Sequence, residues 1–152
     1  MKKEGLASCL GTLDGITASE AEKFAGLKLE MLRDCSLAEI DNAIDGFSGY
    51  LRLLRRGTPP AAVEAEMHRL SCEVVSLAGM FGYKNLGKAA YSLCKLIDER
   101  GTRGQWDRIA VDVHFDAMRL LRYPENLSEE KQEHLLQGLR LVIDHARKSV
   151  EK

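Results

Sequence analysis

The sequence predicts an all-α fold: an antiparallel four-helix bundle with additional helices before and after it. Apolar residues recur at alternating steps of three and four, which is the spacing of one helix face. Glycine and proline interrupt this pattern where helices should end and begin, and no segment alternates apolar and polar residues as a half-buried strand does. The chain has 152 residues, of which 45% are hydrophobic, enough for one sizeable core. We therefore expect a single domain over residues 1–152.

Four apolar stripes define the bundle, which we place at about residues 36–122. Ser36 begins the first helix, and Glu39 completes a capping box with it. Each stripe supplies the core-facing side of one helix. In chain order the stripes consist of Leu37, Ile40, Ile44, Phe47, Leu51 and Leu54; Val63, Met67, Leu70, Val74, Leu77 and Phe81; Leu86, Ala90, Leu93 and Ile97; and Trp106, Ile109, Val113, Ala117 and Leu120.

Glycine and proline mark the ends of these helices. The first should end at the turn 57–60, and the second, a helix of about six turns, near Gly82. The third should end at Gly101 and the fourth before Pro124. Because the connections are short, neighbouring helices should run antiparallel.

Two further helices are expected outside the bundle. Residues 17–34 carry a less regular apolar pattern, which we interpret as a helix lying across one end of the bundle. Residues 128–150 should form the last helix, since Ser128 can cap it and acidic residues follow in its first turn. Its buried face should comprise Leu135, Leu139, Val142 and Ala146.

The charge balance and the apolar runs restrict the partners. Lys and Arg total 22 and Asp and Glu 23, a formal net charge of -1, so no overall field attracts nucleic acid or an anionic membrane. Apolar runs are far shorter than the roughly 20 residues of a membrane span. The start of the chain has no continuous apolar core of the kind found in a signal peptide, so we expect a cytoplasmic protein without membrane insertion.

The cysteines Cys9, Cys35, Cys72 and Cys94 are scattered without a C-x-x-C pair, which indicates reduced thiols. All except Cys72 are interpreted as small apolar fillers or loop residues. His68 and Cys72 have the i, i+4 spacing of two metal ligands on a helix, but zinc needs further ligands and the sequence points to none. We predict neither a metal site nor a cofactor.

The second bundle helix carries an unusual outward face. His68, Cys72, Val75 and Gly79 fall on a stripe that should face away from the core. With Ser76 beside it, this stripe is small and almost uncharged, where Lys or Glu would be expected on a solvated surface. Small residues let another surface approach the helix closely, so these five residues are the candidate docking site.

The segment Ala78–Tyr83 resembles the one that follows the phosphorylated histidine in histidine phosphotransfer (HPt) domains of bacterial phosphorelays. In that family Lys and Gly follow the histidine three and four residues later, and a glycine closes the segment ten residues after it. Aligning Gly82 with the closing glycine places Cys72 at the histidine position, Val75 at the lysine position and Ser76 at the glycine position. The family's acceptor histidine is therefore replaced.

The resemblance extends over roughly Ser36–Arg122, because Ala90–Ile97 and Val111–Arg119 are similar to the next two helices of a bacterial HPt subgroup. It implies the HPt fold, and as a partner either the receiver domain of a response regulator or a histidine kinase. The charge balance gives no reason to expect nucleic acid as a partner. The sequence leaves the oligomeric state open.

The replaced acceptor changes the expected chemistry. Phosphoryl transfer from a receiver aspartate needs an exposed imidazole nitrogen that can attack in line. A thiol with a pKa near ~8.5 is mostly protonated at neutral pH, and Cys72 lacks the neighbouring lysine. His68 is the other candidate acceptor, but it lies one helical turn, about 5.4 Å, from the family position. A solvated surface histidine is the plain alternative for His68.

Three functions follow. We expect an HPt-like signalling protein that binds a receiver domain or kinase without phosphoryl transfer. The alternatives are an active relay intermediate that uses His68 or Cys72, and a plain helical dimerisation module.

Other charged residues have two interpretations. Arg52, Arg55 and Arg56 suit a helix C-terminus, or form a basic rim that meets an acidic receiver. His114 should be a partly buried histidine with a hydrogen-bond partner.

Overall fold

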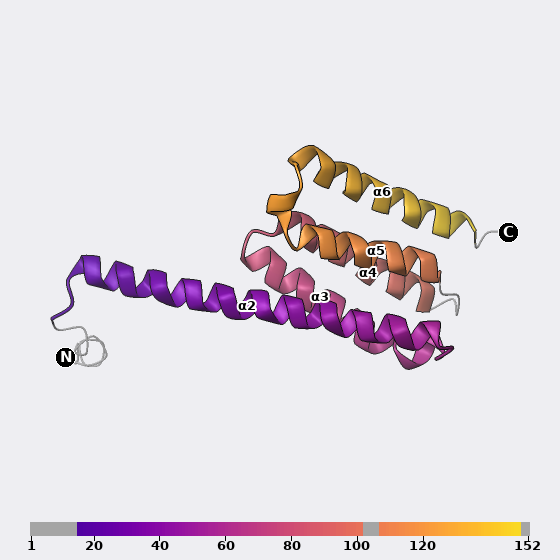
Figure 1. Ribbon diagram of the computed structural model, residues 1–152, viewed down its shortest axis with the longest axis horizontal. Helices are drawn as coiled ribbons and strands as arrows, with labels where there is room; N and C mark the ends of the chain where they lie inside the picture. The colour runs from indigo at the N-terminus through magenta and orange to yellow at the C-terminus, as the bar shows by residue number, and fades with distance from the viewer. Residues whose placement is uncertain (1–14, 102–106, 150–152) are drawn as a thin grey trace, which may run out of the picture. The chain divides into compact units, whose positions relative to one another are not determined.

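The computed structural model describes residues 15–101 and 107–149. All regular secondary structure in this part of the chain is helical and it contains no strand, which confirms the all-α prediction (Figure 1). None of its helices combines the length and the hydropathy that a membrane span needs. The described elements are α2 (Ala18–Arg55), η1 (Pro60–Ala62), α3 (Glu64–Met80), α4 (Lys84–Gly101), α5 (Arg108–Leu121), η2 (Pro124–Asn126) and α6 (Glu129–Lys148).

The chain divides into two compact units, Met1–Cys35 and Ser36–Lys152. Helix α2 contributes to both, and in the first unit all its side chains are exposed. The helix predicted to begin at Ser36 is therefore wrong, because Ser36 and Glu39 lie inside α2 and cannot cap it. Likewise, the separate helix predicted for 17–34 is the N-terminal part of α2.

The capping box of α2 lies at Thr17 instead. The hydroxyl Oγ1 of Thr17 accepts a hydrogen bond from the backbone N–H of Glu20 at 3.3 Å, and the Glu20 carboxylate accepts one from the Thr17 N–H at 2.8 Å. Thr17 and Glu20 have the same spacing as Ser36 and Glu39, so the sequence contains two possible capping boxes. No proline separates them, and the helix continues through the second.

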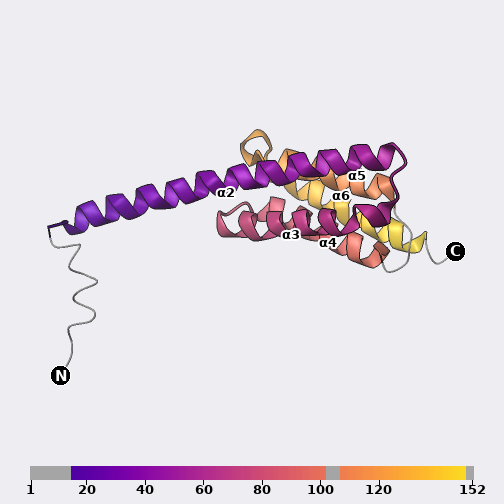
Figure 2. The same cartoon turned by 90° about the horizontal axis from the view of Figure 1, so that it is seen from below.

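The second unit is a bundle in which successive helices reverse direction. From Ser36 onward α2, α3, α4 and α5 alternate in this way, and α6 packs against α4 and α5 (Figures 1 and 2). Every member of the main hydrophobic cluster belongs to this unit. Burying each large apolar side chain contributes roughly 1.5–3 kcal/mol. The largest fully buried apolar side chains are Phe47, Ile40, Met67, Leu86, Leu93, Ile97, Met118, Leu121, Leu139, Val74 and Val111.

Two glycines end helices as predicted, because each adopts a left-handed backbone. Gly57 has φ +95° and follows α2, where its N–H bonds to the carbonyl of Leu54 and the Thr58 N–H to that of Leu53, both at 3.1 Å. This is a Schellman motif. Gly82 has φ +81° and ends α3 in a similar way. Helix α3 has 17 residues, fewer than the six turns predicted, because η1 precedes it.

The apolar stripe predicted for the fourth bundle helix is wrong except at Ala117, which is buried. Ile109, Val113 and Leu120 are 75%, 38% and 51% exposed, and Trp106 lies outside the described residues. The phase is set by packing, since the Phe115 ring contacts that of Phe47 with centroids 6.0 Å apart. Apolar residues occur around most of α5, so its sequence allows two phases. The buried face is Ala110, Val111, His114, Phe115, Ala117, Met118 and Leu121.

The last helix follows its prediction more closely. The Ser128 hydroxyl caps α6 by accepting a hydrogen bond from the Lys131 N–H at 3.3 Å. Leu139 and Ala146 are buried, and Leu135 and Val142 pack half-buried against the core. The predicted apolar face of α6 is confirmed.

Candidate functional site on helices α3 and α4

The predicted docking residues lie on α3, whose inward face anchors the helix. Met67, Leu70, Ser71, Val74 and Ala78 are buried in the bundle. Ser71 is tolerated there because its hydroxyl donates to the carbonyl of Met67 at 2.9 Å. The outward side of α3 is thereby held in a fixed orientation.

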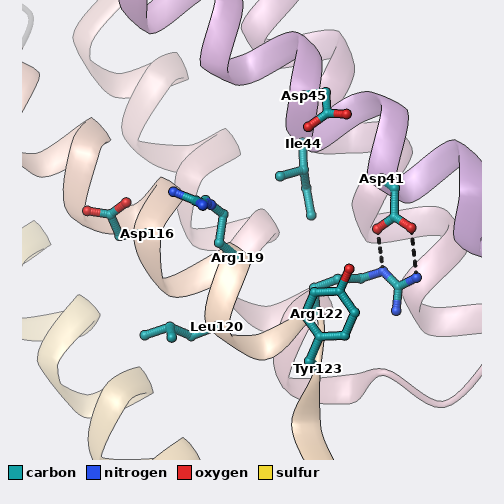
Figure 3. A pocket seen from close by; sticks show the side chains of 8 residues that line it. All are labelled: Asp41, Ile44, Asp45, Asp116, Arg119, Leu120, Arg122 and Tyr123. Carbon is teal, nitrogen blue, oxygen red and sulfur yellow. Dashed lines mark hydrogen bonds and ion pairs between the residues drawn. The ribbon is translucent and has the colours of Figure 1, made fainter. Parts of the chain in front are cut away.

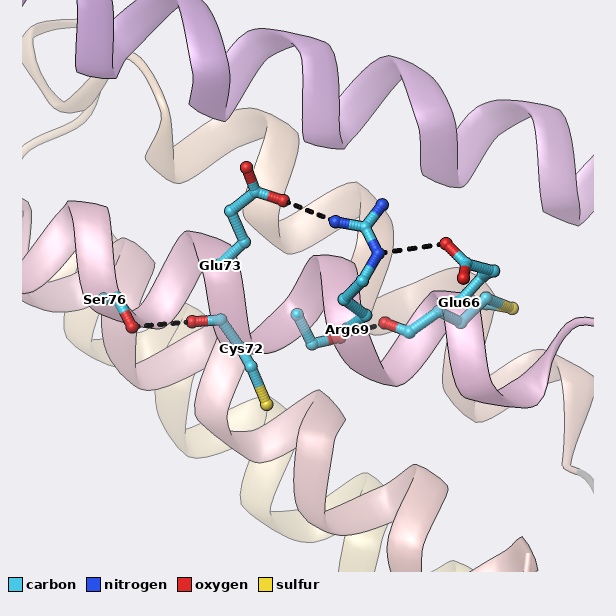
Figure 4. A network of polar contacts seen from close by, with 7 residues as sticks. Glu66, Arg69, Cys72, Glu73 and Ser76 are labelled. Carbon is cyan, nitrogen blue, oxygen red and sulfur yellow. Dashed lines mark hydrogen bonds and ion pairs between the residues drawn. The ribbon is translucent and has the colours of Figure 1, made fainter.

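Four of the five predicted docking residues reach the surface. Cys72, Ser76 and Gly79 are exposed, and His68 is half-buried. The Ser76 hydroxyl is turned back to the carbonyl of Cys72 at 3.0 Å (Figure 4). A Cβ added at Gly79 would meet no atom within 4 Å. This part of α3 therefore presents small groups and open space.

Val75 departs from the prediction. Its side chain is half-buried and packs against the core instead of facing outward. Helix α4 approaches the α3 backbone closely at this level, because a Cβ added at Gly87 would lie 3.7 Å from the Cβ of Ala78 and 4.0 Å from the Val75 carbonyl oxygen. The position that corresponds to the family's lysine is thus partly buried.

A charged network flanks the small residues. The Arg69 guanidinium donates to the carboxylates of Glu66 at 3.0 Å and of Glu73 at 3.1 Å (Figure 4). These hydrogen bonds, that of Glu66 first, raise the pKa of Arg69. Pairs of this kind on an exposed helix contribute little to stability. These ion pairs hold the charged side chains of Arg69 and Glu73 against each other on the helix surface near Cys72.

The structure brings Cys94 to Cys72. Their Sγ atoms are 3.5 Å apart, and the His68 nitrogens Nδ1 and Nε2 lie 3.8 and 3.9 Å from the Cys72 Sγ. The Nε2 atom of His68 is also 3.1 Å from Oδ1 of Asp98. Two thiols, an imidazole and a carboxylate therefore meet where α3 and α4 pack together. Cys94 is buried, and Cys72 is exposed.

Burial governs the acidity of Cys94. Desolvation first, and then the hydrogen bond and the charge of the neighbouring Cys72, raise the pKa of Cys94 to about 12. The raised pKa keeps the Cys94 thiol protonated at physiological pH. It is not an activated nucleophile in the state that the structure describes.

The sequence contains a signal for this cluster, which the interpretation of Cys94 as a filler missed. Cys94 and Asp98 repeat the i, i+4 spacing of His68 and Cys72. The tight turn at Gly82 joins the two helices, with Cys72 ten residues before it and Cys94 twelve residues after it. In an antiparallel helix pair, positions almost equally distant from the turn lie opposite each other.

A groove between α2 and α5 was not predicted from the sequence. Its volume is about 760 Å³, and Arg122 closes one side by donating to both carboxylate oxygens of Asp41, at 2.7 and 3.0 Å (Figure 3). Because the groove carries both signs of charge, it favours no particular ligand charge. It is lined by Asp41, Ile44, Asp45, Asp116, Arg119, Leu120, Arg122 and Tyr123.

The remaining candidates have structural surroundings. Arg55 pairs with Asp112 at 3.3 Å, and Arg52 and Arg56 are exposed. His114 is fully buried, more deeply than predicted, and has the predicted hydrogen-bond partners. Comparisons with protein-family models, with curated proteins and with solved structures gave no match to this chain.

Proposed function

We propose that this protein is an HPt-like signalling protein of the cytoplasm, whose α3 face docks a receiver domain or a histidine kinase without accepting a phosphoryl group. The exposed surface at Cys72, Ser76 and Gly79 carries the proposal. Gly79 leaves open space beside the helix backbone, which lets a partner approach closely. The residues that resemble HPt domains, 36–122, also belong to the bundled unit.

The chemistry around Cys72 supports docking without transfer. A phosphoryl group on the Cys72 sulfur would share its site with the Asp98 carboxylate, which lies 3.1 Å from His68. Because His68 Nε2 is also 3.9 Å from the Cys72 sulfur, the carboxylate lies in the same neighbourhood and disfavours a dianion there. Val75, half-buried against the core, supplies no positive charge. His68 has its Nε2 engaged with Asp98, so it is not a free in-line acceptor.

A binding experiment with matched glycine variants tests the docking face. Gly79→Glu introduces a bulky charge on the α3 surface, and Gly138→Glu makes the same change on α6, where an added Cβ also meets nothing within 4 Å. Binding to a panel of purified receiver domains and kinase cores should be lost in Gly79→Glu and kept in Gly138→Glu. Circular dichroism should show both variants folded. Equal binding by the two variants would remove the α3 face from the proposal.

A labelling experiment tests the absence of transfer. Incubation with labelled phospho-receiver should leave the chain unlabelled. An acid-labile, base-stable label lost in His68→Gln would instead establish a phosphoramidate and an active relay. A label lost only in Cys72→Ser would establish a thiophosphate.

Self-association is a second candidate function, favoured by the exposed apolar residues of the first unit. Phe24, Leu27 and Met31 follow steps of three and four along α2 and are 60%, 60% and 68% exposed. Such a stripe is typical of a helical dimer seam. Light scattering should then report a dimer that Leu27→Glu converts to a monomer. A wild-type monomer at all concentrations would exclude this seam.

A further inference from the structure

The side-chain cluster between α3 and α4 has the composition and dimensions of a metal site. The ligand atoms of His68, Cys72 and Cys94 all lie within 4.8 Å of one another. The two Sγ atoms are 3.5 Å apart, and the Nδ1 of His68 is 3.8 Å from the Cys72 Sγ. At zinc–sulfur and zinc–nitrogen bonds of about 2.3 and 2.0–2.1 Å, tetrahedral angles place two sulfurs about 3.8 Å apart and sulfur and nitrogen about 3.6 Å apart. These two distances are within about 0.3 Å of the tetrahedral values, and the His68 nitrogen and the Cys94 Sγ, which lie within 4.8 Å, need to approach by up to about 1.2 Å through side-chain rotation.

We propose that His68, Cys72 and Cys94 bind a tetrahedral zinc ion that joins α3 to α4. Thiolate and imidazole ligands favour zinc over magnesium or calcium, which prefer oxygen. This inference does not rest on the proposed docking function, because it needs no partner protein. Three protein ligands leave a fourth position for water, in the manner of an open zinc site.

Asp98 acts on the ion through His68 as a positioning residue. Its Oδ1 is 3.1 Å from Nε2, so the Nε2–H of a neutral His68 donates to the carboxylate and leaves the lone pair of Nδ1 for the metal. Carboxylates commonly orient metal-binding histidines in this way. The Asp98 carboxylate also adds negative charge near a cation.

The fold presents the ligands without rearranging the backbone. Each pair spans one helical turn, His68 to Cys72 on α3 and Cys94 to Asp98 on α4. Ligands on packed helices are held more precisely than ligands on loops. Cys72 is exposed and gives the ion access from solvent, whereas Cys94 is buried and closes the inner side.

The binding step balances in charge and protons. Both thiols lose their protons to solvent as two sulfur–zinc bonds form, and neutral His68 donates its Nδ1 lone pair. Two thiolates neutralise the divalent ion. No oxidant or reductant takes part. Because the thiols must be free to bind the ion, the experiments below start from fully reduced protein from which a chelator has removed metal.

Titration of the reduced, full-length protein with Co²⁺ under anaerobic conditions tests the proposal. One equivalent should produce thiolate-to-cobalt charge-transfer absorption and the visible bands of tetrahedral cobalt. Zn²⁺ should then bleach both, because zinc binds such sites more tightly than cobalt. Absence of the charge-transfer band in the reduced wild-type protein would overturn the proposal.

Paired cysteine variants locate the ion. Cys72→Ser with Cys94→Ser should abolish the charge-transfer band, and the control Cys9→Ser with Cys35→Ser removes as many thiols while keeping it. Cys9 lies outside the described residues and Cys35 is exposed in the first unit. Retention of the band in the first double variant would place the ion elsewhere and refute the site. If that variant is unfolded, Cys72→Ser at its exposed position should lower the charge-transfer absorption by about half or more, and an unchanged band would refute the site.

The Asp98→Asn variant separates positioning from packing. The zinc affinity, measured by competition with a chelating dye, should fall about 10- to 100-fold, in the range seen for partners of metal-binding histidines. The cobalt bands should persist, and the metal-free protein should melt at the wild-type temperature. Unchanged affinity would remove Asp98 from the site.

Discussion

His114 is fully buried in α5, and its two hydrogen bonds suit the neutral ring. Nδ1–H donates to the Ala110 carbonyl at 2.7 Å, and Nε2 accepts from the Ser92 hydroxyl at 2.9 Å. In a protonated ring Nε2 would also carry a hydrogen, so the Ser92 hydroxyl would have to rotate in order to accept instead of donate. Desolvation accordingly lowers the pKa of His114, and the Ala110 hydrogen bond offsets this only in part.

The lowered pKa of His114 makes stability depend on pH. Below about pH 6.5, the pKa of an unfolded histidine, the unfolded chain binds a proton that the folded chain does not, so stability falls as pH falls. The neutral His114 makes its full contribution to stability above about pH 6.5. Urea unfolding of wild type and His114→Gln should show a steeper loss for wild type below pH 6.5, by up to about 1.4 kcal/mol per pH unit. Parallel curves would contradict the neutral, buried ring.

Gln132 is a second buried polar residue with all its groups occupied. Its Nε2 donates to the carbonyls of Pro124 and Leu127, both at 3.1 Å, and its Oε1 accepts from Asn85 at 2.9 Å. Gln132→Leu should lower the free energy of unfolding by about 1–3 kcal/mol, because buried carbonyls lose their donor. The exposed Gln137 provides the matched control, and Gln137→Leu should change stability by less than about 0.5 kcal/mol in the same urea titration. Equal effects would show that the buried contacts of Gln132 contribute nothing.

The residue pattern predicted half of the cluster around Cys72. His68 and Cys72 are neighbours on one helix and can be found by spacing alone, whereas Cys94 and Asp98 enter only through the register of two helices. That register depends on where the turn at Gly82 ends α3. Val75 illustrates the opposite error, since no local pattern reveals that α4 approaches closely at Gly87.

At the level of the elements, helix ends were more predictable than helix faces. Gly57, Gly82 and Ser128 act through local backbone geometry and follow their predictions. The face of α5 depends on what lies opposite, and Phe115 packs on Phe47 from a helix far away in sequence. Where a helix is apolar on most sides, its periodicity cannot choose the phase.

Two adjacent leucines test the phase of α5. Leu121 is 1% exposed and Leu120 is 51% exposed. Leu121→Lys should bury an unpaired ammonium and destabilise the protein by several kcal/mol. Leu120→Lys should stay within about 0.5 kcal/mol of wild type, since a cation also suits the last turn of a helix. Thermal melts would contradict the observed phase if the two variants exchanged behaviour.

At the scale of the whole molecule, only one of the two units contains the hydrophobic core that stabilises the fold. The hydrophobic core lies entirely in Ser36–Lys152. In the first unit the described residues of α2 are all exposed. The second unit should therefore unfold cooperatively without the first. The sequence could not reveal this, because Ser36 with Glu39 and Thr17 with Glu20 have the same capping pattern, and the pattern alone does not show which of them begins a helix.

A fragment of residues 34–152 should restore the capping box that the full-length chain does not use. In the full chain Ser36 lies within α2, where the preceding turn already satisfies its backbone, so Ser36→Ala should be neutral or stabilising by up to about 0.5 kcal/mol. In the fragment, Ser36 stands near a new helix start and can accept from the Glu39 N–H. The same substitution should then cost about 1 kcal/mol. Urea titrations of the four proteins, monitored by circular dichroism, measure the difference. An identical effect of Ser36→Ala in both lengths would mean that the helix of the fragment begins elsewhere.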